Sequence, residues 1–166
     1  MELVPTNPPT ASELVITEIQ YHPGPNLDSG DWIELSNPGA TSVNLTGWIF
    51  RDEEDLHAFL LPSRVLAPGG SLVLCESDFK FRQFNAVTVP VAGDFRFGLG
   101  NGGDTLRLFR PDGTLALAVR YSDLAPWPAA ADGAGSTLQL ISPGLDPAQP
   151  GSWRASPEVG GTPGRQ

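Results

Sequence analysis

Residues 105–121, TLRLFRPDGTLALAVRY, decide the fold class of this 166-residue chain. The segments 105–110 and 115–121 both have the composition of β-strands, and a Pro-Asp-Gly turn at 111–113 separates them. Two strand-like segments joined by such a turn predict a β-hairpin. The chain is therefore expected to contain antiparallel β-structure.

Similar strand signals recur at short intervals along the chain, close to turns rich in proline, glycine or asparagine. They are found at 14–21, 32–36, 43–50, 58–61, 71–76 and 137–141. Strands at this spacing are typical of a sandwich or a barrel. We therefore predict an all-β chain that folds as an antiparallel β-sandwich.

Helices are expected to contribute little to this fold. No segment keeps helical periodicity over about a dozen residues. At most one short helix is expected, at about 77–84, where Ser77 can cap the first turn and Phe81 and Phe84 point inward. Parallel βαβ units are not expected, because the crossover helices that they need are missing.

The composition agrees with a folded chain of short strands and many turns. The 19 glycines and 17 prolines make up more than a fifth of the residues, while hydrophobic residues reach 40% and charged residues only 17%. Disordered chains usually have the opposite balance of hydrophobic and charged residues. We expect a Pro-rich linker at 1–12, the domain at 13–158 and an unstructured tail at 159–166.

The net charge of −9 disfavours nucleic acid as a partner. Phosphate backbones are polyanions, and the ten basic residues are dispersed singly along the chain. No apolar run is long enough to cross a membrane, and residues 1–5 lack the features of a signal peptide. The chain is expected to be either cytosolic or a piece of a larger exported protein.

The single cysteine, Cys75, excludes an intrachain disulfide and any zinc site built on paired cysteines. It ends the apolar segment 71–75, so we interpret it as a small buried residue and not as a reactive thiol. His22 and His57 lie in no recognisable nucleophile or metal motif, so we interpret both as surface or loop histidines.

Two loops contain residue types that also occur in ligand sites. The acidic run at 52–55 and the pair Asp28 and Asp31 could supply oxygen ligands to calcium, but no EF-hand spacing is present. We favour a solvated surface for the run and an Asx-type turn at 28–31. The glycine-rich segment 98–104 lacks the lysine of a phosphate loop and leads into a strand, so its glycines are expected to supply positive φ angles.

No catalytic, cofactor-binding or metal-ligating residue is therefore predicted, no cofactor is expected, and the chain is interpreted as a non-enzyme. Among the tryptophans, Trp48 is expected in the core, in the middle of a strand, and Trp32 on the opposite face of its strand. Trp127, between two prolines in a long loop, could be an exposed platform for a protein or a sugar. We favour the alternative that it folds back and plugs the end of the sandwich.

Several short motifs occur in an order that resembles bacterial lamin-tail domains over about residues 13–164. These motifs are ITEI at 16–19, DWIELSNP at 31–38, VNLTGW at 43–48, LAPGGSLV at 66–73, LGNGGDTLRL at 99–108, GSTLQL at 135–140, WRAS at 153–156 and GTPG at 161–164. The resemblance implies an immunoglobulin-like β-sandwich. Eukaryotic relatives bind proteins, chromatin and DNA, but this chain has neither a preceding heptad segment nor a basic localisation run.

Similar bacterial domains are accessory modules of secreted or surface proteins. The resemblance therefore implies a non-catalytic interaction or tethering module of a larger bacterial protein, located outside the cell or in its envelope. The partner would be a protein or a component of the cell surface or matrix. A carbohydrate- or matrix-binding module is the alternative, and nucleic-acid binding is a weaker one. Since edge strands can pair, the chain is expected to be a monomer or a weak dimer.

Overall fold

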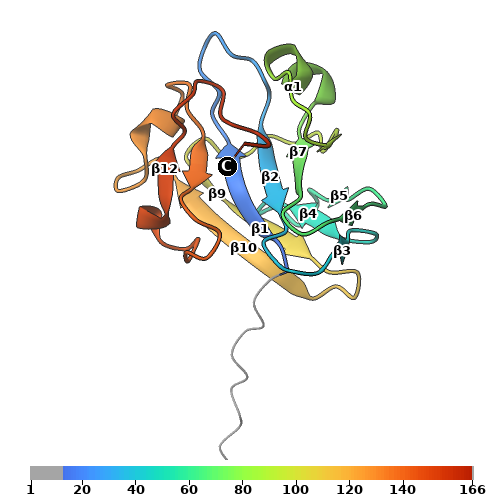
Figure 1. Cartoon of the computed structure of the whole chain (residues 1–166). Coiled ribbons are helices and arrows are strands. Elements are labelled where there is room, and N and C mark those ends of the chain that lie inside the picture. Colours follow the sequence, from blue (N-terminus) through green and yellow to red (C-terminus); the bar gives the residue numbers. More distant parts are fainter. Residues whose placement is uncertain (1–12, 166) are drawn as a thin grey trace, which may run out of the picture.

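Two β-sheets packed face to face form the fold in the computed structural model, which describes residues 13–165 (Figure 1). The six-stranded sheet has the order β12 (Trp153–Ala155), β11 (Leu138–Leu140), β1 (Val15–Gln20), β2 (Trp32–Ser36), β7 (Ser71–Cys75), β8 (Val91–Ala92). The four-stranded sheet has the order β10 (Leu115–Ser122), β9 (Gly103–Phe109), β4 (Ile49–Arg51), β5 (Phe59–Leu60). The linker predicted at 1–12 lies outside the described residues.

Short elements complete the chain. The strands β3 (Val43–Asn44) and β6 (Val65–Leu66) form a separate two-stranded ladder. The helix α1 (Asp78–Phe84) is preceded by Ser77, whose side chain accepts a hydrogen bond from the backbone N–H of Lys80. Two 3₁₀ helices, η1 (Ala129–Ala131) and η2 (Pro150–Ser152), lie in the C-terminal third.

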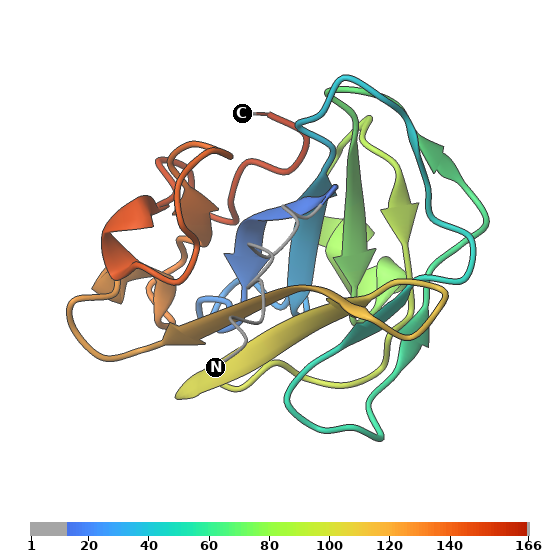
Figure 2. The same ribbon diagram turned by 90° about the horizontal axis from the view of Figure 1, so that it is seen from below.

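Alternating side chains build the core between the two sheets. Along β9, Leu106 and Leu108 are buried, whereas Thr105, Arg107 and Phe109 are half-buried. Figure 2 shows the yellow strands of the four-stranded sheet on one side of the molecule and the blue strands β1 and β2 on the other. The predicted β-sandwich with an immunoglobulin-like fold is thus confirmed, together with the short helix and the hairpin of β9 and β10. Phe81 of the helix is buried as predicted, but Phe84 is 42% exposed, so the prediction that it points inward is wrong.

Several details of the predicted strands are wrong. The segment 43–50 is not one strand, because a turn in which Trp48 N–H bonds to Leu45 C=O separates β3 from β4. Trp48 is buried as predicted, but it lies in this turn. The short strands β6, β8 and β12 were not predicted. In addition, β7, α1 and β8 form a parallel βαβ unit, so the prediction that no such unit occurs is wrong: the connection that contains α1 is long enough for a crossover.

A second apolar cluster lies on the outer face of the six-stranded sheet. Trp32, Val73 and Cys75 point outward from β2 and β7 and pack under Phe81 of α1. The rings of Trp32 and Phe81 meet edge to face with centroids 5.5 Å apart. The predictions that Trp32 lies on the face opposite the core and that Cys75 is buried are therefore confirmed. Burial raises the pKa of the Cys75 thiol to about 12.

The C-terminal segment 159–165 covers part of the same outer face, so the prediction of an unstructured tail is wrong for these residues (Figure 1). The backbone N–H of Thr162 donates to Oε1 of Glu18 over 2.7 Å, and that of Gly164 donates to Oε2 of Glu34 over 2.5 Å. The glycines and prolines that suggested a tail allow the backbone to approach β1 and β2 closely. The packed fold therefore continues past residue 158.

Candidate interaction site

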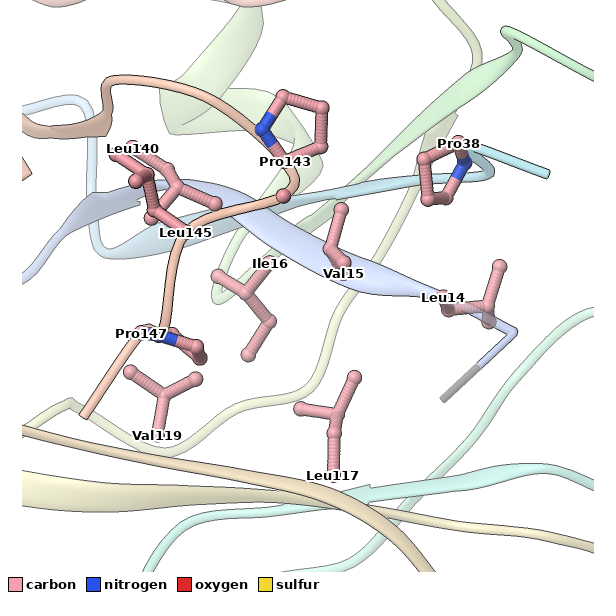
Figure 3. Close-up of a pocket in the computed structure, with 11 residues that line it drawn as sticks. Leu14, Val15, Ile16, Pro38, Leu117, Val119, Leu140, Pro143, Leu145 and Pro147 are labelled. Atoms are coloured by element: carbon pink, nitrogen blue, oxygen red, sulfur yellow. The ribbon is translucent and has the colours of Figure 1, made fainter. Parts of the chain in front are cut away.

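An apolar groove of about 420 Å³ opens on one side of the sandwich, between β1 and β10 (Figure 3). Its walls are aliphatic side chains and prolines, and none of the residues among 13–165 that line it is charged. The lining residues are Leu14, Val15, Ile16, Pro38, Leu117, Val119, Leu140, Pro143, Gly144, Leu145 and Pro147. A concave apolar surface of this kind is suited to binding other apolar groups.

The groove exists because β1 is only partly covered by β11. The two strands pair at Glu18 and Ile19, so that in the described part of the chain no strand lies beside Val15 and Ile16 on that side. The chain leaves the sheet after Leu140 and forms the loop at 142–149, which closes one end of the groove. This loop is held in place by bonds from Ser152 Oγ to Asp146 C=O (2.6 Å) and from Trp153 Nε1 to Pro147 C=O (3.0 Å).

The opposite wall is the edge strand β10, which pairs only with β9 within the part of the chain that the structure describes. Leu117 and Val119 point from β10 into the groove (Figure 3). An edge strand presents backbone N–H and C=O groups that can pair with another chain. The groove and this edge together can accept an extended peptide, whose backbone would pair with β10 and whose alternate side chains would enter the groove.

Neither histidine belongs to a catalytic arrangement among residues 13–165. Nδ1 of His22 lies 2.6 Å from Oδ1 of Asp132, and Nδ1 of His57 lies 2.7 Å from Oδ2 of Asp52. Within residues 13–165, neither ring is hydrogen-bonded to a serine, threonine or cysteine side chain. The His57 ring stacks on Phe97 with centroids 4.8 Å apart, and the hydrogen bond to Asp52 raises the pKa of His57.

The acidic run at 52–55 does not lie wholly in solvent as predicted. Glu53, Glu54 and Asp55 are exposed, but Asp52 is buried. Its Oδ1 accepts the backbone N–H of Glu54 over 2.8 Å, and its Oδ2 lies against His57. The Asp52 carboxylate thus organises the loop from within. In the described part of the chain, no three His, Cys, Asp or Glu side chains converge to hold a metal ion.

The glycine-rich loop at 98–104 binds carboxylates of the chain itself. The backbone N–H of Leu99 donates to Oδ2 of Asp31 over 2.7 Å, and that of Gly100 donates to Oδ2 of Asp104 over 2.9 Å. Asp31 therefore bridges to a distant loop and does not form the predicted local turn. Burial raises the pKa of Asp31 to about 7. Of the glycines in this loop, Gly103 has the expected positive φ, at 131°.

Trp127 is half-buried and packs against the core. Its ring centroid lies 6.3 Å from that of Trp153 in β12. This position favours the plug over the fully exposed platform. The groove itself was not predicted, since its residues come from four separate parts of the sequence. The only local signal is the loop Pro143-Gly144-Leu145-Asp146-Pro147, which places a leucine between turn-forming residues.

Comparison with known protein families assigns a family to this chain. A scan against protein families matches residues 7–123 to the lamin tail domain. The match spans more than half of the chain and includes β1 to β10, whereas β11, β12 and the C-terminal segment lie beyond it. A search of curated proteins finds no match. Within residues 13–165, no helix has the length and apolar character that a membrane span requires.

Proposed function

Since the chain belongs to the lamin tail domain family, we propose that it is a non-catalytic module that tethers a larger bacterial protein to a protein partner. The family fold is immunoglobulin-like and often serves in protein interaction. The observation that carries the proposal is the apolar groove bordered by the edge strand β10. The partner would be an extended segment with aliphatic side chains at alternate positions, which adds to β10 as a further strand.

A carbohydrate partner has less support. Sugar platforms use exposed aromatic rings, but Trp32, Trp48 and Trp153 are buried and Trp127 is half-buried. The exposed rings of Phe79 and Phe84 belong to α1 and do not line the groove. The groove offers aliphatic walls without charged groups, which suit peptide side chains better than hydroxyl groups. For this reason the aliphatic peptide is the proposed occupant.

The first prediction concerns the groove. A fluorescent synthetic peptide with Val or Leu at alternate positions should bind the chain in an anisotropy titration, and Leu145→Glu should weaken binding about tenfold or more, because it places a charge against apolar side chains. Leu145 lines the groove and is 41% exposed, so the substitution leaves the core intact. In NMR spectra, the backbone amides of 115–121 should show the largest shifts.

The matched control is Leu124→Glu, which introduces the same charge at an exposed leucine outside the groove. It should bind the peptide like the unmodified chain. Equal binding by both variants, or shifts that concentrate away from β1 and β10, would show that the groove is not the site.

The exported location of the parent protein is part of the same proposal and needs its own measurement. An antibody raised against the domain should detect the parent protein in the envelope or culture-medium fraction of the source bacterium. Detection confined to the cytoplasmic fraction would contradict export and leave the groove experiment unaffected.

A further inference from the structure

The solvent face of the four-stranded sheet carries two parallel rows of side chains of different character. The first row is apolar and crosses all four strands in register: Leu60 pairs with Ile49, Ile49 with Phe109, and Phe109 with Leu115. Leu60 and Leu115 are 64% and 50% exposed, and the two central residues are half-buried. A continuous exposed apolar row is unusual on the surface of a monomer.

The second row, two residues along the strands, is basic. Arg51 lies directly opposite Arg107, and Arg107 is opposite Ala118. Arg120 lies two residues further along β10, opposite Thr105, just beyond this row. The guanidinium groups of Arg51 and Arg107 lie 5.9 Å and 5.7 Å from the ring centroid of Phe109. The two rows are therefore in contact and form one surface, which we call the arginine–aliphatic face.

A hollow of about 470 Å³ lies in this face, lined by Ile49, Arg51, Asp55, Phe109, Arg110, Pro111 and Gly113. Two arginines of the face are already paired within the chain: Arg107 with Asp55 over 2.8 Å and Arg110 with Glu13 over 2.9 Å. Among residues 13–165, Arg51 and Arg120 form no ion pair. These two guanidinium groups are therefore available to carboxylates of a partner, on a face that also borders the acidic run 52–55 and Asp112.

From this arrangement we propose that the arginine–aliphatic face binds an amphipathic, acidic α-helical segment of a partner protein. The apolar row spans about 14 Å, because strands are about 4.8 Å apart, and this equals about ten residues of α-helix. The two rows are about 7 Å apart, so one helix about 10 Å wide covers both. Its apolar stripe would lie on the first row, and carboxylates on its flank would pair with Arg51 and, at the outer edge of the flank, with Arg120.

The charge balance favours such a segment over nucleic acid. The positive charge is local, and Asp55 and Glu13 lie among the arginines. The remainder of the chain carries a strong negative charge, which repels a long polyanion more than it repels a short helix with a few carboxylates. A phosphate backbone also has no apolar side chains that could pack on the apolar row.

The test uses a labelled helical peptide with leucines at i, i+3, i+4 and i+7 and glutamates along one flank. It should bind in an anisotropy titration, and raising NaCl to about 0.5 M should weaken binding. Arg51→Glu should weaken it about tenfold or more, and Arg51→Lys much less. Leu60→Asp, at an exposed position where folding is not at risk, should also weaken it about tenfold.

The control variants introduce the same changes in charge at positions away from the face. Arg64→Glu and Leu124→Asp, both at exposed positions, should bind the peptide normally. Equal binding of a peptide with lysines in place of the glutamates would overturn the proposal, as would no binding at all. The proposal would also be overturned if a short DNA duplex bound more tightly than the peptide and Arg51→Glu abolished this DNA binding. Because this face lies on the opposite side of the sheet from the groove, Leu145→Glu should leave it unaffected.

Discussion

Two buried glutamine side chains on neighbouring strands differ in their hydrogen bonding. In β11, Gln139 Nε2 donates to Thr162 Oγ1 over 2.6 Å, and its Oε1 accepts from Arg154 Nε over 2.8 Å. In β1, both amide atoms of Gln20 lack a partner among the described residues, as does Nε1 of Trp32 directly across the strand pair. Burying an amide without a partner costs free energy, so Gln20 is a destabilising residue.

Replacing Gln20 with leucine should therefore raise the free energy of unfolding by about 1 kcal/mol, because an unpaired amide is exchanged for an apolar group of similar size. The measurement is chemical denaturation followed by tryptophan fluorescence. The matched variant Gln139→Leu breaks two hydrogen bonds and should lower the same free energy by about 1–3 kcal/mol. A loss of similar size in both variants would mean that the Gln20 amide is satisfied in solution.

At the scale of elements, the packing of the C-terminal segment 159–165 against the six-stranded sheet requires glycine at one position. Gly161 has a φ of +86°, and a Cβ atom there would lie 2.5 Å from Oε1 of Glu18, 2.7 Å from Cγ2 of Thr137 and 3.0 Å from the Trp32 ring. The segment can cover the outer face of the six-stranded sheet only because this position has no side chain. A Gly161→Ala variant combines backbone strain with steric conflict.

This variant should lose about 2–4 kcal/mol of unfolding free energy, from about 1 kcal/mol of strain and about 1–3 kcal/mol of overpacking. Gly113→Ala is the control, because Gly113 has nearly the same φ, +84°, but no atom within 4 Å of its Cβ position. It should lose only about 1 kcal/mol. Denaturation curves of equal midpoint for the two variants would show that the segment is not packed as described.

The elements differ in how far the sequence predicts them. The segment 32–36 was predicted to the residue, and the hairpin nearly so, because long strands carry both composition and turn signals. β8 and β12 have two and three residues and no pattern of their own, so only their neighbours define them. The segment 159–165 has the composition of a tail, although Thr162 is bonded to Glu18, 144 residues away.

The binding surfaces could not be predicted for a related reason. The groove joins 14–16, 117–119 and 140–147, and the arginine–aliphatic face joins residues of four strands. In the sequence, Arg51, Arg107 and Arg120 are isolated, so their clustering depends entirely on strand order and register. The absence of sequence clusters of basic residues therefore did not exclude a basic face.

For the whole molecule, two buried carboxyl groups connect stability to pH. Burial, reinforced by the nearby charge of Glu34, raises the pKa of Glu18 from 4.5 to about 7. Burial raises the pKa of Asp31 from 3.8 to about 7, with Glu76 as a further contributor. The folded chain thus binds more protons than the unfolded chain between about pH 4 and pH 7. The contribution of these two carboxyl groups to the unfolding free energy is largest below their pKa values in the unfolded chain, and it is lost as the pH rises through 7.

The unfolding free energy should therefore fall between pH 6 and pH 8, by about 1 kcal/mol for each carboxyl group. Denaturation at a series of pH values measures this slope. The variants Glu18→Gln and Asp31→Asn keep an oxygen that can accept the hydrogen bonds from Thr162 N–H and Leu99 N–H, but they cannot titrate. Each should remove about half of the slope, and the double variant most of it. The unfolding free energy could instead rise from pH 6 to pH 8, or the double variant could keep the slope. Either result would show that the two carboxyl groups titrate at their ordinary pKa values.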